Sequence, residues 1–180
     1  MVSPCATLAV MGALSDVADR LDSAAHAIVG LEPDLAARAP WPLADRFGTE
    51  PEASWGPPEL LAHVSEMLPY WMGEIERIVE APPDLDPVPF GRVSGDPVRL
   101  AIIGRDRTVP IRELLARVSV DARRVSGRLR QLDLDDGSGR QGLHPRLGPM
   151  RLADIGERFL ASHAEEHVLQ LREILDAAGA

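Results

Sequence analysis

The chain has 180 residues, of which 45% are hydrophobic and 26% charged, and its formal net charge at pH 7 is −9. This composition excludes a disordered chain and predicts a single globular domain over residues 1–180. The acidic balance argues against nucleic acid or an anionic membrane as the main partner.

The basic residues and the lone cysteine narrow the chemistry further. All 19 basic residues are arginine, and without a lysine amine neither Schiff-base nor P-loop chemistry is available. Cys5 is the only cysteine, which excludes a disulfide within the chain and fits a reducing compartment. No run of about 20 apolar residues occurs, and residues 4–14 lack the basic start of a secretion signal. We therefore expect a soluble cytoplasmic protein with no membrane partner.

The first part of the chain predicts one helix and a long connection. Apolar residues at helical spacing predict a helix over residues 6–29. Residues 31–56 contain several prolines and are expected to be irregular, fixed in place by Trp41, Phe47 and Trp55. A connection of this length is either functional or partly mobile.

A second helix is predicted over residues 57–80. Proline suits its first turn, and Glu59 stands where a carboxylate caps the start of a helix. Pro69 removes one backbone hydrogen bond at mid-helix and predicts a kink. His63 lies at the edge of the apolar stripe, so a histidine faces a helix-packed interior.

The next part of the chain predicts two loops around a third helix. Residues 81–107 are proline-rich and are expected to be irregular. A helix is predicted over residues 108–132, with Thr108 as its N-cap and Pro110 near its first position. Residues 133–150 are rich in turn-forming residues and predict a loop. No segment is a convincing strand.

The last predicted helix, residues 151–177, carries His163 and His167 within its apolar stripe, and residues 177–180 are expected to be a frayed tail. Positions four apart lie on one face of a helix. Two such imidazoles suit a divalent metal, although a buried histidine is more often a core residue with a satisfied hydrogen bond. The predicted fold is all-α, a four-helix bundle with long inter-helix loops.

His63 joins this pair because sites in helix bundles are built from facing helices. Three neutral imidazoles in a dry core would each need a partner, whereas one metal ion satisfies them together. Three protein nitrogens with one open position make the arrangement of a catalytic zinc site. The metal lowers the pKa of a water or thiol in the open position.

Two stretches resemble the DinB/YfiT-like family. HPRLGPMRLADIGERFLASHAEEHVLQLREIL resembles its C-terminal signature, with a loop glycine, His-x-x-x-His and an apolar end that contains Gln. WGPPELLAHVSEML resembles its second-helix signature, with Gly56 in place of the usual Ser or Thr cap. Their order and spacing agree over residues 8–176. The resemblance implies a four-helix bundle with one divalent metal ion, zinc or nickel, on His63, His163 and His167.

The resemblance also implies an enzyme. Relatives use the metal to activate a low-molecular-weight thiol such as mycothiol or bacillithiol, which they transfer to an electrophile. The expected function is a metal-dependent thiol S-transferase or a related hydrolase, with small-molecule partners and a possible homodimer through helix faces. Arginines in the loops are candidates for recognising a substrate carboxylate: Arg46, Arg92, Arg105 and Arg146.

Glu166 belongs to a second pattern. Residues 163–167 also fit the H-x-x-E-H motif of inverted zinc proteases, with Glu166 as the base. That class needs a further acidic ligand well downstream, and too few residues follow His167, so this interpretation is rejected. Glu166 remains a candidate for a catalytic or ligand-orienting role.

The sequence is also compatible with two other hypotheses. The metal could stabilise a non-catalytic stress-response or interaction module, and a fourth protein ligand would then close the site. The candidates for that ligand are His144, Glu59 and Glu166. Alternatively, the chain is a helical domain with buried histidines and no metal.

Overall fold

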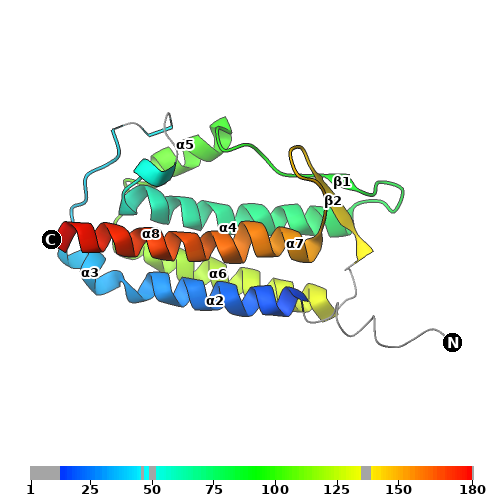
Figure 1. The fold of residues 1–180 in the computed structure, drawn as a ribbon, viewed down its shortest axis with the longest axis horizontal. Helices are drawn as coiled ribbons and strands as arrows, with labels where there is room; N and C mark the ends of the chain where they lie inside the picture. The colour runs from blue at the N-terminus through cyan, green and yellow to red at the C-terminus, as the bar shows by residue number, and fades with distance from the viewer. Residues whose placement is uncertain (1–12, 46, 49–51, 135–138, 180) are drawn as a thin grey trace.

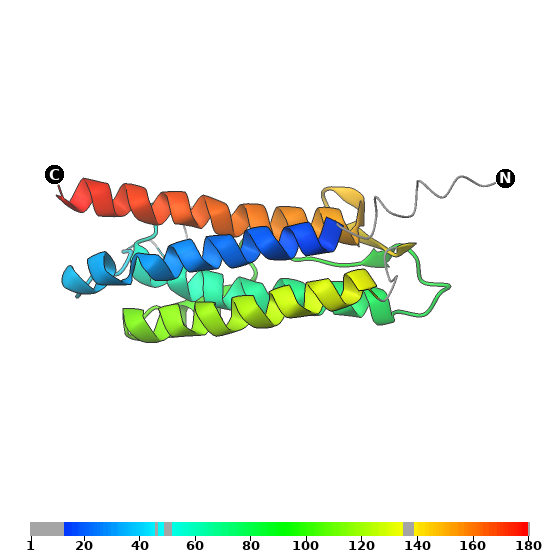
Figure 2. The same cartoon turned by 90° about the horizontal axis from the view of Figure 1, so that it is seen from below.

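The long helices lie side by side in the computed structural model, which describes residues 13–45, 47–48, 52–134 and 139–179 (Figures 1 and 2). These helices are α2 (Ala13–Gly30), α4 (Pro57–Glu80), α6 (Ile111–Leu134) and α8 (Ser162–Gly179). The chain is mostly helical, as predicted, and a small sheet lies at one end of the helices. No helix in the described ranges is long and apolar enough to cross a membrane.

The core lies between the long helices because each has one apolar face. Helix α6 packs against α2 and α4, and α8 packs against the same two helices. Fully buried side chains come from each of them: Leu21, Met67, Leu114 and Leu171. Burying such side chains drives the helices together, at roughly 25 cal/mol for each Å² of apolar surface. The predicted second helix is confirmed, and whether Pro69 kinks it stays a prediction.

Two of the predicted loops contain short helices, and the prediction was wrong there. Residues 31–56 include α3 (Glu32–Ala37) and the 3-10 helix η1 (Glu52–Ser54), and residues 81–107 include α5 (Pro97–Asp106). Proline was interpreted as a helix breaker. In α3 and α5 it occupies the first turn, where its missing N–H costs nothing.

The small sheet corrects the expectation that no strand would form. Its order is β1-β2-β3, with β1 (Val88–Pro89) parallel to β2 (Gln141–His144) and β2 antiparallel to β3 (Gly148–Arg151). These strands are too short to show an alternating pattern. Gly148 has a φ of +76° and lets the β2–β3 hairpin close.

The third helix begins and ends later than predicted. It spans α6, and Thr108 lies before it, where its hydroxyl donates to the Arg105 carbonyl oxygen at 2.8 Å. The Pro110 carbonyl instead accepts the N–H groups of Glu113 and Leu114. Thr108 is therefore not the N-cap.

The last helix is continuous but changes its winding. It begins as α7 (Leu152–Gly156), passes through the π-helical turn η3 (Glu157–Ala161) and continues as α8 to Gly179. The expected frayed tail is thus helical up to Gly179. In the π-turn the Ser162 N–H donates to the Glu157 carbonyl oxygen, five residues back. Such turns occur often at functional sites.

The remaining sequence expectations lie partly outside the described residues. The predicted first helix is described only from Ala13, where α2 begins. Its part over residues 6–12, together with Cys5 and Arg46, falls in the ranges that are not described.

Candidate functional site

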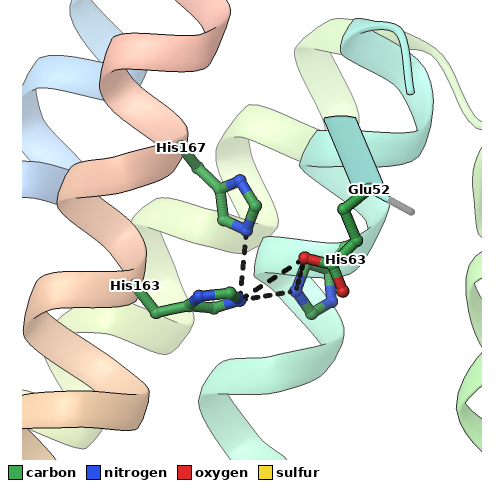
Figure 3. Close-up of side chains that lie close together, drawn as sticks. All are labelled: Glu52, His63, His163 and His167. Carbon is green, nitrogen blue, oxygen red and sulfur yellow. Dashed lines mark hydrogen bonds and ion pairs between the residues drawn. The ribbon is translucent and has the colours of Figure 1, made fainter. Parts of the chain in front are cut away.

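Three histidine side chains meet between α4 and α8. His63 comes from α4, and His163 and His167 come from α8 (Figure 3). The Nε2 atom of His163 lies 3.0 Å from Nε2 of His63 and 3.2 Å from Nε2 of His167. The structure therefore brings together the three residues that the sequence predicted. His163 and His167 both lie in α8, after the π-turn, so the turn does not alter the α-helical spacing that places them on one face.

Gln170 determines which ring nitrogen of His167 carries the proton. Its side-chain N–H donates to the backbone oxygen of Glu52 at 2.9 Å, so its Oε1 faces His167 and accepts from Nδ1–H at 3.1 Å. A neutral imidazole has one N–H and one lone pair. Nε2 of His167 therefore presents a lone pair to the other two rings, which is the tautomer that a metal requires.

Nε2 of His163 has two short nitrogen contacts but at most one proton. If Nε2 of His163 carries a proton, it can donate along only one of its two short contacts. If it carries none, it faces the lone pair of His167 directly. In either case the two short contacts of His163 cannot both be hydrogen bonds, and the further donor near this cluster is Arg99, whose Nη2 lies 3.4 Å from Nε2 of His63.

Burial favours the neutral form of these rings. His63 and His167 are each 3% exposed. Burial is the main cause that lowers the pKa of His63 well below 6.5, against the opposing effect of the Glu52 carboxylate. Burial, followed by the charge of His163, lowers the pKa of His167 to about 3. The lone pairs of His63 and His167 are therefore available near neutral pH.

The spacing of the nitrogens is compatible with a shared divalent ion. Two nitrogens bound at ~2.05 Å to one tetrahedral ion are about 3.3 Å apart. Adjacent nitrogens in an octahedron with bonds of ~2.1 Å are about 3.0 Å apart. The observed separations of 3.0 and 3.2 Å fall at these values. The residues present therefore fit such an ion.

Glu52 completes the cluster, and sequence analysis missed it. Glu52 and the three histidines each offer one ligand atom, and these four atoms all lie within 4.8 Å of one another. Oε2 of Glu52 lies 3.8 Å from Nε2 of His63 and 3.9 Å from Nε2 of His163 (Figure 3). Its Oε1 binds Arg99, a buried residue of α5. Glu52 lies in the irregular connection before α4, where no periodic pattern indicates which side chain faces the core.

A second pair of charges lies behind His63. Glu66 is 7% exposed, and its Oε2 lies 3.8 Å from Nδ1 of His63 and 2.6 Å from the Arg92 guanidinium. Arg92 also covers the ring of Tyr70, with its guanidinium carbon 3.6 Å from the ring centre. Glu66 is three residues after His63 on the same helix face, so the sequence contained a signal for it.

A pocket of about 490 Å³ opens onto this cluster. Glu52, His63 and His163 line part of it, together with the apolar side chains of Trp71 and Phe159. Pockets of this size hold small molecules. The cluster is thus accessible to a ligand from one side, and His167 lies behind it.

Arg20 fixes the π-turn that precedes His163. Its guanidinium contacts Glu157 at 2.5 and 2.6 Å and Glu165 at 2.5 and 2.9 Å. These contacts raise the pKa of Arg20 above its ordinary value and, with the Ser162 hydroxyl, lower that of Glu157. Glu165 thus holds the turn to α2.

The candidates for a fourth ligand do not join the cluster. Glu59 is fully buried and accepts from the backbone N–H groups of Ala44 and Gly56, at 2.9 and 3.2 Å, which supports its capping role. His144 lies at the end of β2, where it stacks on Phe159. Burial lowers the pKa of its ring. Glu166 lies 3.4 Å from Nδ1 of His163, the nitrogen that faces away from the cluster, and its side chain is 72% exposed.

The arginine candidates differ in position. Arg92 lines the pocket. Arg105 binds the neighbouring Asp106, and its side chain is 71% exposed. Arg146 is exposed in the β2–β3 hairpin and does not line the pocket. The sequence did not indicate Arg99 or Arg158, which do line it.

Comparison of the chain with models of protein families, with curated protein sequences and with solved structures gives no match.

Proposed function

We propose that this chain is a DinB/YfiT-like four-helix bundle that holds one zinc or nickel ion on His63, His163 and His167. The observation that carries the proposal is the convergence of three Nε2 atoms beside a pocket, with separations of 3.0 and 3.2 Å from Nε2 of His163 to the other two. The packing of both α6 and α8 on α2 and α4 supports the bundle.

The reaction that we propose is S-transfer from a low-molecular-weight thiol, such as mycothiol or bacillithiol, to a small electrophile. A divalent cation beside the thiol would lower the thiol pKa towards neutrality. Oε2 of Glu52 would accept the thiol proton while Arg99 holds Oε1 in place. The sulfur would then form a bond to the electrophilic carbon, and the leaving group would depart with its electron pair and take up the proton from Glu52.

Hydrolysis is a second candidate that the same carboxylate favours. Oε2 of Glu52 faces the histidine cluster, where it could equally take a proton from a water molecule. The non-catalytic alternative is a metal-stabilised module in which Glu52 is a fourth ligand that closes the site. The pocket beside the cluster favours catalysis over this alternative.

The test is the metal content of protein purified without a His-tag or a chelating column. We expect close to one divalent ion per chain in the wild type. We expect none in a variant with His63→Ala, His163→Ala and His167→Ala, with helicity by circular dichroism retained. His26→Ala is the matched control because His26 is an exposed histidine on α2, and this variant should keep its metal.

The outcomes separate the alternatives. Wild-type protein that refuses zinc and nickel would overturn the metal proposal and leave a helical domain with buried histidines. If metal binds, thiols are screened against small electrophiles, and hydrolysis is assayed with esters and amides. Stoichiometric metal without turnover, and with Glu52 coordinated by X-ray absorption, would favour the non-catalytic module.

A further inference from the structure

The charges buried around the histidine cluster cancel one another. Arg99 pairs with Glu52, and Arg92 pairs with Glu66 at 2.6 Å. Histidine binds a metal ion as a neutral imidazole. A divalent cation at the cluster would therefore leave net positive charge in a partly enclosed pocket, because Glu166, a largely exposed carboxylate that also lines the pocket, offsets only part of it. Such a pocket attracts anions, because excess charge is costly where water is partly excluded.

Arg158 adds a further positive charge at the edge of this pocket. It lines the pocket and is exposed. Among the described residues, no carboxylate lies within ion-pair distance of Arg158. The neighbouring Glu157 is bound to Arg20. The guanidinium of Arg158 thus keeps its donors for a ligand, whereas Arg92 is paired with Glu66, and Arg99 is bound to Glu52 and to the Ser94 carbonyl oxygen.

The pocket wall beside Arg158 is apolar and held in place. The rings of Trp71 and Phe159 stack with their centres 4.2 Å apart and an interplanar angle of 17°. Phe159 also stacks on His144, at 5.5 Å. The Arg158 guanidinium carbon lies 5.9 Å from the centre of the Phe159 ring. A cation and an apolar surface are therefore adjacent, and both line the cavity that reaches the histidines.

We propose that this pocket binds a small organic carboxylate, with the carboxylate at Arg158 and the apolar part along Trp71 and Phe159. The inference rests on the proposed function, because the excess positive charge arises only when the cluster holds its metal. Arginine suits the task because its planar donors match the two oxygens of a carboxylate.

The test is calorimetric titration of the zinc-loaded chain with three probes of one shape: 3-phenylpropionate, 3-phenylpropionamide and 3-phenylpropylamine. We expect the acid to bind at least about tenfold more tightly than the amide, and the amine to bind most weakly. Arg158→Gln should weaken the acid by about fivefold, since the residue is exposed, and leave the amide unchanged. Arg172→Gln is the control, because Arg172 is an exposed arginine of α8 outside the pocket.

The zinc content of each sample is measured before the probes are added. Zinc bound at one ion per chain, with acid and amide of equal affinity or with Arg158→Gln indistinguishable from wild type, would overturn the carboxylate proposal alone. A chain that refuses zinc would overturn the proposed function, and the carboxylate proposal with it.

A competition experiment tests whether the carboxylate belongs to the thiol or to the electrophile. The zinc-loaded chain is saturated with 3-phenylpropionate and titrated with 3-mercaptopropionate and with its neutral methyl ester. Competition between the two acids, absent for the ester, places the carboxylate on the thiol. Simultaneous binding places it on the electrophile, and both results agree with a carboxylate site at Arg158.

Discussion

Glu59 and Glu52 each pair with an arginine near the start of α4, but their surroundings differ. Glu59 is fully buried, and its oxygens accept from two backbone N–H groups and from Arg107 at 3.1 Å. Glu52 binds Arg99 with one oxygen only. Its other oxygen lies 3.8 and 3.9 Å from two imidazole nitrogens, beyond hydrogen-bond distance.

The two carboxylates differ in how completely their oxygens are hydrogen-bonded. The hydrogen bonds of Glu59 tie the residues before α4 to the helix, and nothing remains for a ligand to satisfy. Oε2 of Glu52 faces the imidazoles beyond hydrogen-bond distance, and Nε2 of His163 has two short nitrogen contacts but at most one proton to donate. A bound ion or substrate would satisfy these atoms together.

The largest expected effect is on stability, at Glu59. Glu59→Gln removes the charge from a buried pair and turns an amide N–H towards a group that is itself a donor. We expect the free energy of unfolding to fall by about 3 kcal/mol. Urea denaturation followed by circular dichroism measures it. A fall below about 1 kcal/mol would show that Glu59 is not the structural partner in the comparison.

The matched change at Glu52 should act on the reaction instead. Glu52→Gln keeps the shape of the side chain but removes the proton acceptor. We expect a turnover at least about 100-fold slower, equivalent to about 2.7 kcal/mol in the barrier. Stability in urea should change by less than about 1 kcal/mol. A variant with full turnover but less metal would reassign Glu52 from base to ligand.

Gln170 contacts both His167 and the backbone oxygen of Glu52, and two substitutions test these contacts one at a time. Gln170→Leu removes the acceptor that fixes the His167 tautomer, so we expect zinc affinity to fall by about thirtyfold, or ~2 kcal/mol. Gln170→Glu keeps an acceptor for Nδ1–H but loses the donor to the Glu52 backbone, and it should retain zinc affinity. Competition with a chromophoric chelator measures both. Equal losses in the two variants would contradict the tautomer argument.

The histidine cluster should also make metal-free protein sensitive to acid. The pKa of His167 is lowered from 6.5 to about 3 in the folded chain, so the unfolded chain binds the proton first as the pH falls. Stability is therefore constant above about pH 6.5 and decreases below it, by about 1.4 kcal/mol per pH unit for this group until the pH approaches 3.

Urea denaturation in the presence of a chelator, repeated at intervals from pH 7 to pH 4, measures this slope. His167→Phe has no proton to bind there and should show a shallower slope. His26→Ala, which changes an exposed histidine, should retain the wild-type slope. Identical slopes for wild type and His167→Phe would mean that the ring is not buried in its neutral form.

The sequence predicted the long helices and the three histidines because both follow from periodicity. His163 and His167 share one helix face by spacing alone, and His63 faces the interior with its own apolar stripe. Glu52 and Arg99 have no such signal, because they come from segments whose prolines indicate only irregular backbone. Their meeting depends on how α5 and η1 pack against α4, which is a tertiary contact. The residues at i+3, Glu66 and Gln170, could have been predicted from helix geometry.

The smallest expected effect concerns Glu166, the catalytic candidate from the sequence. Its carboxylate lies 3.4 Å from Nδ1 of His163, and its side chain is 72% exposed. An exposed carboxylate gives little to stability, and although Glu166 lines the pocket, it lies beside Nδ1 of His163 and not at the Nε2 atoms of the cluster. Glu166→Gln should therefore change stability and zinc affinity by less than about 0.5 kcal/mol and slow turnover by less than about threefold. Steady-state kinetics of Glu166→Gln and Glu52→Gln, measured side by side, compares their turnover. A loss at Glu166 as large as that at Glu52 would make Glu166 the base and return Glu52 to a purely structural role beside Arg99.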